Sequence, residues 1–328
     1  MNKALSLLLA LLFAQYIQAN IHHIGNGHPY TKVEDAAPFA VPGDTIMLHD
    51  GIHPAQGTIQ NLHGQAGAWI YIMGAPKEKA IIEGGIEGIK FTEASYLHIS
   101  RLTIRSSGWE NIVNIDDAGT YATPTHHIII DGCVFKDILG QGNHDILKLT
   151  GVDDFEVRNC RFINGSYGDG AGIDMNGCHN GIIEDNYFEN PGRFAMQMKG
   201  GCKDIEVRRN HFNGGCERTI HIGGSHPITH FRPLGVPYEA SDIWVYSNLF
   251  IGGLSPIAYV GAVNSHVVNN TFIDPKKWIM RILQENTDSS LLPCGDNSFI
   301  NNIVYTGPLF QNGKINISSN TAPQTFTF

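Results

Sequence analysis

Polar side chains that can transfer protons or bind carboxylates recur at nearly constant spacing through the middle of the chain. Each stands between two apolar residues: Lys148, Asp174, Gln197, His221, Tyr259 and Arg281. The first four follow one another at intervals of 26, 23 and 24 residues. Alternation of apolar and polar residues is typical of a strand with one buried face. We therefore predict that these six side chains form one outward-facing column across successive strands.

A second outward column is expected two residues further along the same strands, where Asn176 and Lys199 stand. Neighbouring strands stack at about 4.8 Å, so the column from Lys148 to His221 would span roughly 14 Å, the length of a few sugar residues. Polar residues are common on any outer face because water is there. An acidic chain that gathers Lys, His and Arg on one face nevertheless favours a binding groove.

These side chains suit the β-elimination of a uronate polymer. A base removes the C5 proton, a cation or strong donor neutralises the adjacent carboxylate, and an acid protonates the leaving oxygen. Lys199 and His221 are the candidate bases, because nearby positive charge lowers a lysine pKa and histidine needs little tuning. Arg281 or Lys148 is the candidate for the carboxylate contact, and Tyr259 is the candidate acid. The other members of the columns are expected to bind substrate: Asp174, Asn176 and Gln197.

A repeated triplet indicates the scaffold that positions these columns. Asn-X-apolar begins at five places, and Cys holds the Asn position in two earlier copies: Asn186, Asn210, Asn248, Asn270 and Asn302, with Cys133 and Cys160. Successive copies, counted from a related triplet at 102–104, are 22 to 38 residues apart. This period, with β-branched strand segments and Gly/Asn/Asp turns, predicts an all-β fold, a single-domain parallel β-helix.

The first 19 residues read as a secretory signal. Lys3 precedes the apolar run 4–14, and a small-residue cleavage site follows at Ala19. A secreted or periplasmic location is therefore predicted, with no membrane association after the signal is removed, since no other apolar run is long enough to span a bilayer. The formal net charge of −9 argues against a nucleic-acid partner.

Residues 20–328 are predicted to form the β-helix domain. A cap at about 28–45, with an amphipathic helix at 30–39, precedes coils at about 45–310 and a polar C-terminal tail.

Three insertions follow the same strand of the coil, at 117–125, 224–241 and 284–297. Loops inserted at one equivalent place would wall a single groove. Arg232 lies in the second loop and is expected to close over bound substrate.

Six cysteines are compatible with disulfides in an exported chain. Cys133 and Cys160 hold equivalent positions on adjacent coils, as do Cys178 and Cys202. Each pair is expected either to stack as small apolar side chains or to form a disulfide, if the geometry allows one.

Two parts of the sequence resemble known carbohydrate-active proteins. Residues 28–51 resemble the opening of secreted right-handed β-helix proteins. Residues 196–200, the turn at 210–212 and residues 218–223 are similar to the catalytic pair of coils in the alginate lyase/chondroitinase B family of polysaccharide lyases.

The resemblance implies a right-handed coil and a catalytic assignment. Lys199 corresponds to the base of that family, and Arg218 or His221 lies near the position that neutralises the carboxylate. The family also implies calcium as a cofactor. The acidic calcium ligands that precede the lysine in that family are not matched, because Phe194 and Met196 occupy the strand there.

The same residues leave other functions open. A uronate C5-epimerase needs nearly the same base, acid and neutralising group. A glycoside hydrolase needs carboxylates about 6.5–9.5 Å apart if inverting and about 5 Å apart if retaining. Asp116 and Asp174 are expected to lie nearer about 11–12 Å apart, although Asp169 could supply a partner. A non-catalytic carbohydrate-binding or adhesive solenoid would expose aromatic platforms, and Tyr259 is the one aromatic residue in the outward columns. The expected partner is an acidic polysaccharide, and no oligomeric state is favoured.

Overall fold

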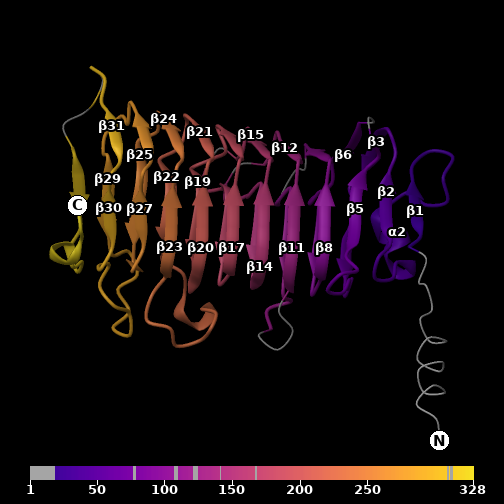
Figure 1. The fold of residues 1–328 in the computed structure, drawn as a ribbon, viewed down its shortest axis with the longest axis horizontal. Helices are drawn as coiled ribbons and strands as arrows, with labels where there is room; N and C mark the ends of the chain where they lie inside the picture. Colours follow the sequence, from indigo (N-terminus) through magenta and orange to yellow (C-terminus); the bar gives the residue numbers. More distant parts are fainter. Residues whose placement is uncertain are drawn as a thin grey trace, which may run out of the picture.

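The computed structural model describes residues 19–76, 79–106, 110–120, 125–140, 142–166, 168–308, 310 and 313–328. Within them the chain winds into a parallel β-helix, with the first strands (indigo) at one end and the last (yellow) at the other (Figure 1). Successive turns of the chain add strands to three parallel sheets, which confirms the predicted fold. The predicted signal peptide at 1–19 lies outside the described residues, apart from residue 19.

The three sheets are called A, B and C here. Sheet A contains, in spatial order, β1 (Ile21–Ile24), β2 (Thr45–Leu48), β5 (Ile70–Gly74), β8 (Ser95–Ser100), β11 (Thr125–Asp131), β14 (Val152–Arg158), β17 (His179–Glu184), β20 (Cys202–Arg208), β23 (Ala240–Tyr246), β27 (His266–Val268) and β30 (Ser298–Ile300), with β26 (Ala262–Val263) paired to β23. Sheet B contains β3 (Gly51–Pro54), β6 (Ala80–Glu83), β9 (Thr103–Arg105), β12 (Val134–Lys136), β15 (Arg161–Ile163), β18 (Tyr187–Glu189), β21 (His211–Asn213), β24 (Leu249–Ile251), β28 (Thr271–Ile273) and β31 (Ile303–Tyr305). Sheet C contains β4 (Thr58–Gln60), β7 (Ile89–Thr92), β10 (Val113–Asp116), β13 (Leu147–Thr150), β16 (Ala171–Asn176), β19 (Phe194–Lys199), β22 (Arg218–Gly223), β25 (Ser255–Val260), β29 (Met280–Leu283) and β32 (Ile315–Ile317).

The apolar residue of the repeated triplet forms the centre of the core. Phenylalanine rings on successive strands of sheet B are buried and pack on one another, with ring centroids 4.6 to 5.3 Å apart: Phe135, Phe162, Phe188, Phe212, Phe250 and Phe272. Offset aromatic contacts of this kind add to the free energy gained from burial. The repeat therefore appears in the sequence because each coil must present the same side chain to the coil below it.

The asparagine of the triplet satisfies backbone groups at a buried turn. Asn210 Oδ1 accepts hydrogen bonds from the backbone N–H and the side-chain amide of Asn186, both at 3.0 Å. Asn210 Nδ2 donates to Ile183 O at 2.8 Å and to Asn248 Oδ1 at 3.1 Å. Equivalent bonds continue through later coils. The buried backbone amides at these turns are therefore hydrogen-bonded, and the energetic penalty of an unpaired amide is avoided.

Cysteine replaces asparagine in the earlier coils without forming a disulfide. The Cys160 backbone N–H donates to Asn186 Oδ1 at 2.8 Å, and the Cys133 N–H donates to the Cys160 sulfur at 3.4 Å. All six cysteines are buried free thiols, so the stacking interpretation is confirmed. The alternative disulfides, Cys133–Cys160 and Cys178–Cys202, are not formed in the structure.

Both ends of the solenoid are covered. The predicted helix at 30–39 is shorter than expected: α2 (Val33–Ala36) passes into the 3₁₀ turn η1 (Ala37–Phe39), and Val33 and Ala36 are buried. At the other end, β32 pairs with β29, and Phe326, directly after the 3₁₀ turn η3 (Pro323–Thr325), packs edge-on against Tyr259. Among the described residues, no helix has the length and apolar character needed to cross a membrane.

Candidate active site

The outer face of sheet C carries the predicted column. Strand pairing places Lys148 beside Asp174, Asp174 beside Gln197, and Gln197 beside His221. Lys199 lies beside Asn176 in the second column. The order and adjacency of these side chains therefore agree with the sequence prediction.

Tyr259 is not part of the column, and its predicted place was wrong by one residue. His221 pairs with Ala258, which in turn pairs with Arg281. Tyr259 lies opposite Ile222, is fully buried, and donates a hydrogen bond from its hydroxyl to Ser298 O at 2.7 Å. A shift of one residue moves a side chain to the other face of a strand, so Tyr259 belongs to the core and cannot act as an acid in the groove.

Asp174 is the centre of an ion-pair network. It is 1% exposed, and it contacts Lys148 Nζ and, at 2.9 Å, Lys199 Nζ. Burial by itself raises the pKa of Asp174, but the two ammonium groups outweigh it and lower the pKa to about 2. Lys148 Nζ also lies 3.4 Å from Asp145 Oδ2. Lys148 is thus held by two carboxylates, which raise its pKa in spite of burial, and it remains a cation.

Asp145 behaves differently from Asp174. Its burial and the nearby charge of Asp174 raise its pKa to about 6. One of its oxygens accepts the backbone N–H of Ala171 at 2.8 Å. Because Asp145 and Asp174 both contact the single nitrogen of Lys148 and both are at most 2% exposed, no sugar ring fits between their carboxyl groups.

His221 is a neutral imidazole between two donors. It is 2% exposed, and burial together with the charges of Arg218 and Lys199 holds its pKa well below the ordinary value. The Gln197 amide oxygen accepts a hydrogen bond from Lys199 Nζ at 3.2 Å, so its nitrogen faces His221 Nδ1 at 3.3 Å. A neutral imidazole accepts at one ring nitrogen and carries its proton on the other, so His221 can accept from only one of its two neighbouring donors, Gln197 or Arg218.

Arg218 is the second donor beside His221. Arg218 Nη1 lies 3.3 Å from His221 Nε2, within hydrogen-bond distance. Arg218 is 6% exposed, and its buried Nε has no hydrogen-bond partner within the described part of the chain. Glu285 Oε1 accepts from Arg218 Nη2 at 2.7 Å. The guanidinium and the imidazole therefore lie together on β22, next to β19, which carries Lys199.

Arg281 lies at the edge of this group. Its Nε donates to Asn316 Oδ1 at 3.0 Å, and its guanidinium stacks over Trp278 with 4.5 Å between the guanidinium carbon and the ring centroid. Arg281 Nη1 is 3.8 Å from Glu217 Oε1. Arg281 thus lies near a carboxylate of the protein, Glu217, and its predicted contact with a substrate carboxylate stays a prediction.

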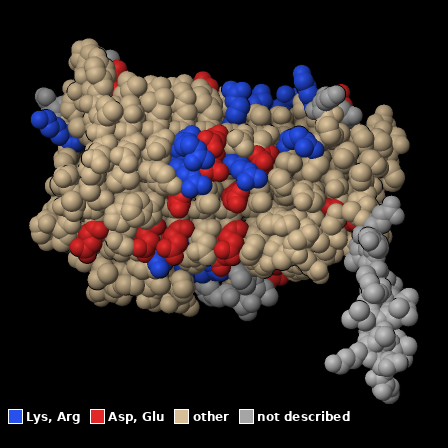
Figure 2. All heavy atoms as spheres, in the orientation of Figure 1, with Lys and Arg blue, Asp and Glu red and all other residues tan. Residues whose placement is uncertain are grey.

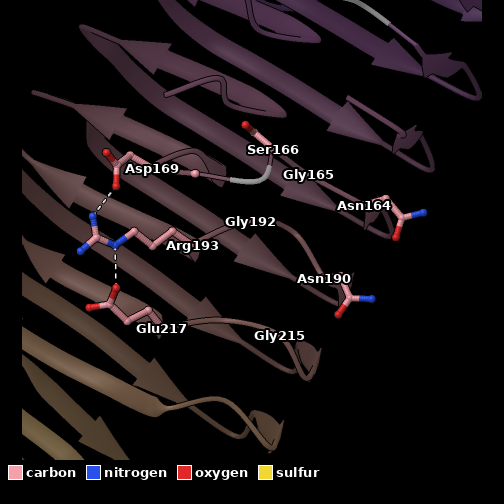
Figure 3. Close-up of a pocket in the computed structure, with 10 residues that line it drawn as sticks. Asn164, Gly165, Ser166, Asp169, Asn190, Gly192, Arg193, Gly215 and Glu217 are labelled. Carbon is pink, nitrogen blue, oxygen red and sulfur yellow. Dashed lines mark hydrogen bonds and ion pairs between the residues drawn. The ribbon is translucent and has the colours of Figure 1, made fainter. Parts of the chain in front are cut away.

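A hollow of about 640 Å³ lies where β16, β19 and β22 begin (Figure 3). Asp169, Arg193 and Glu217 come from successive coils and point toward one another there, with Arg193 bonded to both carboxylates. Asn164 and Asn190 lie at the far end of the hollow in the same view. Its floor therefore offers both a cation and hydrogen-bonding amides to a polar ligand.

A second hollow of about 340 Å³ lies where β13 and β16 end. The ends of these strands and two of the long loops line it: Thr150, Gly151 and Asn176 with Asp117, Gly119, His226, Thr229, His230 and Arg232. The loops at 224–241 and 284–297 are joined through Glu239. Its carboxylate accepts hydrogen bonds from the backbone N–H groups of Gly200 and His226 and from the side chain of Asn286. Described residues of two of the three predicted insertions, 117–125 and 224–241, thus line this hollow. Asp174 lies on β16, which begins at the first hollow and ends at the second.

Arg232 holds its loop against the coils. Its Nη1 and Nη2 each donate to Asp153 at 2.7 Å, and Nη1 also donates to Gly177 O at 3.0 Å. These bonds outweigh the effect of burial and lower the pKa of Asp153 to about 2. Arg232 also lines the second hollow, and its buried Nε has no hydrogen-bond partner among the described residues, so the predicted contact with substrate stays a prediction.

Two carboxylates of the groove were missed in the sequence: Asp145 and Glu217. Both lie just before strands, outside the alternating segments, and Glu285 of the 284–297 insertion joins them in the groove. They pair with the cations of the column, so the predicted cation-rich stripe is a network of mixed charge. The position of Glu217 one coil beyond Arg193, just before a strand, was the only sequence signal that could have identified one of them.

The outer face of sheet A provides a comparison. Basic and acidic side chains gather together over its central strands (Figure 2). They form exposed or half-exposed ion pairs across neighbouring strands, such as Arg208 with Glu184 at 2.7 Å and Arg158 with Asp131 at 3.3 Å. The charged groups of the Asp174 network on sheet C are more deeply buried than these. This difference in burial distinguishes the candidate site on sheet C from the solvated face of sheet A.

The residues of β19 do not fit the calcium site that the resemblance implies. Met196 is fully buried in the core and Phe194 packs against the His221 ring at 4.9 Å. Neither supplies the oxygen ligands that calcium prefers. Within the described ranges, the one group of three or more metal-ligating side chains close enough to share an ion consists of histidines at the N-terminal end.

Comparisons with known proteins agree with the architecture. A family model described as a right-handed beta helix region matches residues 87–272. A comparison with curated proteins gives no match. An alginate lyase from Paenibacillus sp. str. FPU-7 has a similar structure, with a TM-score of 0.56, 16% identity, and coverage of 90% of this chain and 99% of that one. A family 28 exopolygalacturonase from Yersinia enterocolitica has a TM-score of 0.50, 10% identity, and coverage of 93% and 79%. At these identities the likeness establishes a shared fold.

Proposed function

The chain belongs to the right-handed β-helix family, and on that scaffold we propose that the sheet C groove binds an acidic polysaccharide and cleaves it by β-elimination. The observation that carries the proposal is the grouping of Arg218, with its unpaired Nε, and His221 on β22 beside Lys199 on β19. Similar folds in an alginate lyase and an exopolygalacturonase, both named for acidic polysaccharides, support the substrate class. Export of the chain through the apolar segment 4–14 is part of this proposal.

In this mechanism a substrate carboxylate binds beside Arg218 and His221. One carboxylate oxygen accepts hydrogen bonds from Arg218 and, in the tautomer with the proton on Nε2, from His221. Negative charge moves onto that oxygen when the C5 proton leaves, and donors fixed in a buried site stabilise such charge more strongly than water does. His221 is a poor base here, because its pKa lies well below its ordinary value.

Lys199 is the proposed base. It lies on β19, next to the strand that carries Arg218 and His221, and Asp174 and the Gln197 amide position its nitrogen. Lys199, an ammonium ion in its pair with Asp174, must first release a proton to solvent, a step that the charge of Asp174 opposes. The neutral amine then takes the C5 proton, the C5–H electrons form the C4=C5 double bond, and the C4–O bond breaks. The leaving oxygen receives a proton. With Tyr259 buried, Lys199 can return the same proton if both groups leave from one face of the ring.

A glycoside hydrolase is the weaker alternative. The two carboxyl groups with the most divergent pKa values, Asp145 and Asp174, share Lys148 and leave no space for a glycosidic bond. A C5-epimerase would use the same donors and base as the lyase, and it differs only in returning the proton to the other face of C5.

The test is activity of the purified protein on alginate, pectate and chondroitin, followed by the ultraviolet absorbance of new unsaturated ends. Lys199→Ala should lower the rate about 10²–10⁴-fold, as expected for loss of acid–base catalysis. Arg218→Lys should lower it about 10²–10³-fold, as expected for loss of one stabilising donor. Lys203→Ala is the matched control, because Lys203 is a more exposed lysine on sheet A. Its rate should equal that of the wild type.

Each contrary outcome has a definite meaning. New reducing ends without absorbance would indicate hydrolysis. Altered C5 configuration without cleavage would indicate an epimerase. Cleavage that is unaffected in both groove variants would place the chemistry elsewhere, and no change in any polymer would refute a depolymerase acting on these substrates.

A further inference from the structure

A group of histidines lies at the N-terminal end, away from the groove. His23 is on β1, His28 is in the loop after it, and His49 directly follows β2. β1 pairs in parallel with β2, and the His49 N–H donates to Ile24 O at 2.9 Å, so the ends of both strands lie side by side. The loop turns back over them, because the His28 N–H donates to Gly25 O at 3.1 Å.

The three imidazoles are close enough to share one ion. One ring nitrogen from each lies within 4.8 Å of the other two. His23 Nδ1 is 2.9 Å from His49 Nε2, and the His28 and His49 rings are stacked with centroids 3.9 Å apart. His28 is exposed and the other two are half-buried, so the group can be reached from solvent.

The surrounding backbone is shaped around these rings. Gly25 has a φ of +142°, and an added Cβ would lie 3.4 Å from His49 Cβ and 3.6 Å from atoms of His28 and His53. His53 Nε2 donates to the His49 carbonyl at 2.8 Å, which fixes the backbone that carries His49. Hydrogen bonds and packing from residues that do not bind the metal commonly orient the histidines that do.

We propose that His23, His28 and His49 bind one divalent transition-metal ion, with Zn²⁺ as the representative. Imidazole nitrogen suits zinc, copper and nickel better than calcium or magnesium. Nitrogens bound to one tetrahedral zinc are about 3.3–3.4 Å apart, given Zn–N bonds of about 2.0–2.1 Å. The His28 and His49 rings are stacked almost parallel, so the exposed His28 must turn out of the stack to direct a nitrogen at the same ion. Water completes the fourth position.

The ion would add a link between these three segments. β1 is the edge strand of sheet A, and its outer side carries a bridge between Ile24 and Tyr30 in place of a full strand. A metal bound to β1, to the loop and to the end of β2 would fasten this edge to the first coil. Because the unfolded chain does not hold the three rings together, binding would stabilise the folded state in proportion to the logarithm of the free ion concentration.

The test uses the full chain, purified without a polyhistidine tag and freed of metal with a chelator. Zn²⁺ is titrated by calorimetry, and thermal unfolding is followed with and without Zn²⁺. The decisive variant is His28→Phe, which keeps a ring to stack on His49 but removes the ligand nitrogen. His211→Phe is the matched control, because His211 is a partly buried histidine that packs edge-on against Tyr187 on sheet B. His23→Gln serves as a second variant if His28→Phe does not fold.

The wild type and His211→Phe should bind one Zn²⁺ per chain, with an unfolding temperature that rises with Zn²⁺ and falls on chelation. His28→Phe should bind at least about tenfold more weakly, a difference of about 1.4 kcal/mol. It should keep the wild-type unfolding temperature in the absence of metal. Binding well below one ion per chain, or equal affinity in His28→Phe and wild type, would overturn the proposal.

Discussion

Replacing Asp174 with Asn tests the ion-pair network at the centre of the groove. The folded-state pKa of Asp174 is about 2, against an ordinary value of 3.8. At about 1.4 kcal/mol per pKa unit, its charge contributes about 2 kcal/mol to the free energy of unfolding at neutral pH. The substitution also leaves Lys148 and Lys199 without this carboxylate. The loss of stability is therefore at most about 5 kcal/mol, the cost of breaking a buried ion pair. We therefore expect Asp174→Asn to lose between about 2 and 5 kcal/mol at pH 7.

The sign of the pH dependence follows from the lowered pKa. Stability contributed by Asp174 is fully present above the unfolded pKa near 4, and it is lost as the pH falls from about 4 to about 2. The difference between wild type and Asp174→Asn, measured by urea unfolding with circular dichroism, should shrink over that window. Asp169→Asn is the matched control, because its side chain is 68% exposed in an ion pair with Arg193, and it should cost less than about 1 kcal/mol. A variant as stable as the wild type at pH 7, or a difference that does not change with pH, would contradict the reasoning.

Three further predictions concern other parts of the molecule. Asn210→Ala should lower the free energy of unfolding by about 3–4 kcal/mol, since four buried hydrogen bonds at about 1 kcal/mol each are lost. Cys160→Asn should raise the free energy of unfolding by about 1 kcal/mol, because it extends the row of hydrogen-bonded asparagines by one coil. Chemical denaturation measures both variants, and equal effects in the two would refute the role given to the asparagine row. Tyr259→Phe should cost about 1–2 kcal/mol through the loss of its bond to Ser298 O, with cleavage of uronate polymers within twofold of wild type; a large loss of activity would return Tyr259 to the groove. Removing calcium with a chelator should leave that cleavage unchanged, because Phe194 stands where an acidic ligand would be needed, and loss of activity that added calcium restores would show this to be wrong.

The repeat and the main column are visible in the sequence because both depend on local rules. A strand alternates its faces with a period of two, so Lys148, Asp174, Gln197 and His221 appear as polar residues between apolar ones. The triplet recurs because every coil needs the same buried side chain and the same turn. Each short segment carries this pattern by itself, and aligning the segments of successive coils is enough to reveal the column.

Local rules fail where a segment carries no alternation. The strand Ser255–Val260 is apolar almost throughout, so nothing in it distinguishes Tyr259 from Ala258 as the outward residue. Pairing with β22 and β29 decides the register, and it places the tyrosine ring in the core against Phe326. The choice depends on neighbours that are distant in the sequence.

The charge of the groove is likewise decided by tertiary structure. The sequence by itself determined the coil, the column and the places of the loops. It placed Asp174 beside the cations of sheet C but did not pair them with Asp145, Glu217 or Glu285, since Asp145 and Glu217 precede strands and Glu285 lies in a loop 67 residues after Arg218. Only folding brings these carboxylates to the lysines and arginines and buries His221 between two donors, because contact distance and burial depend on how the coils stack and not on the order of residues along the chain.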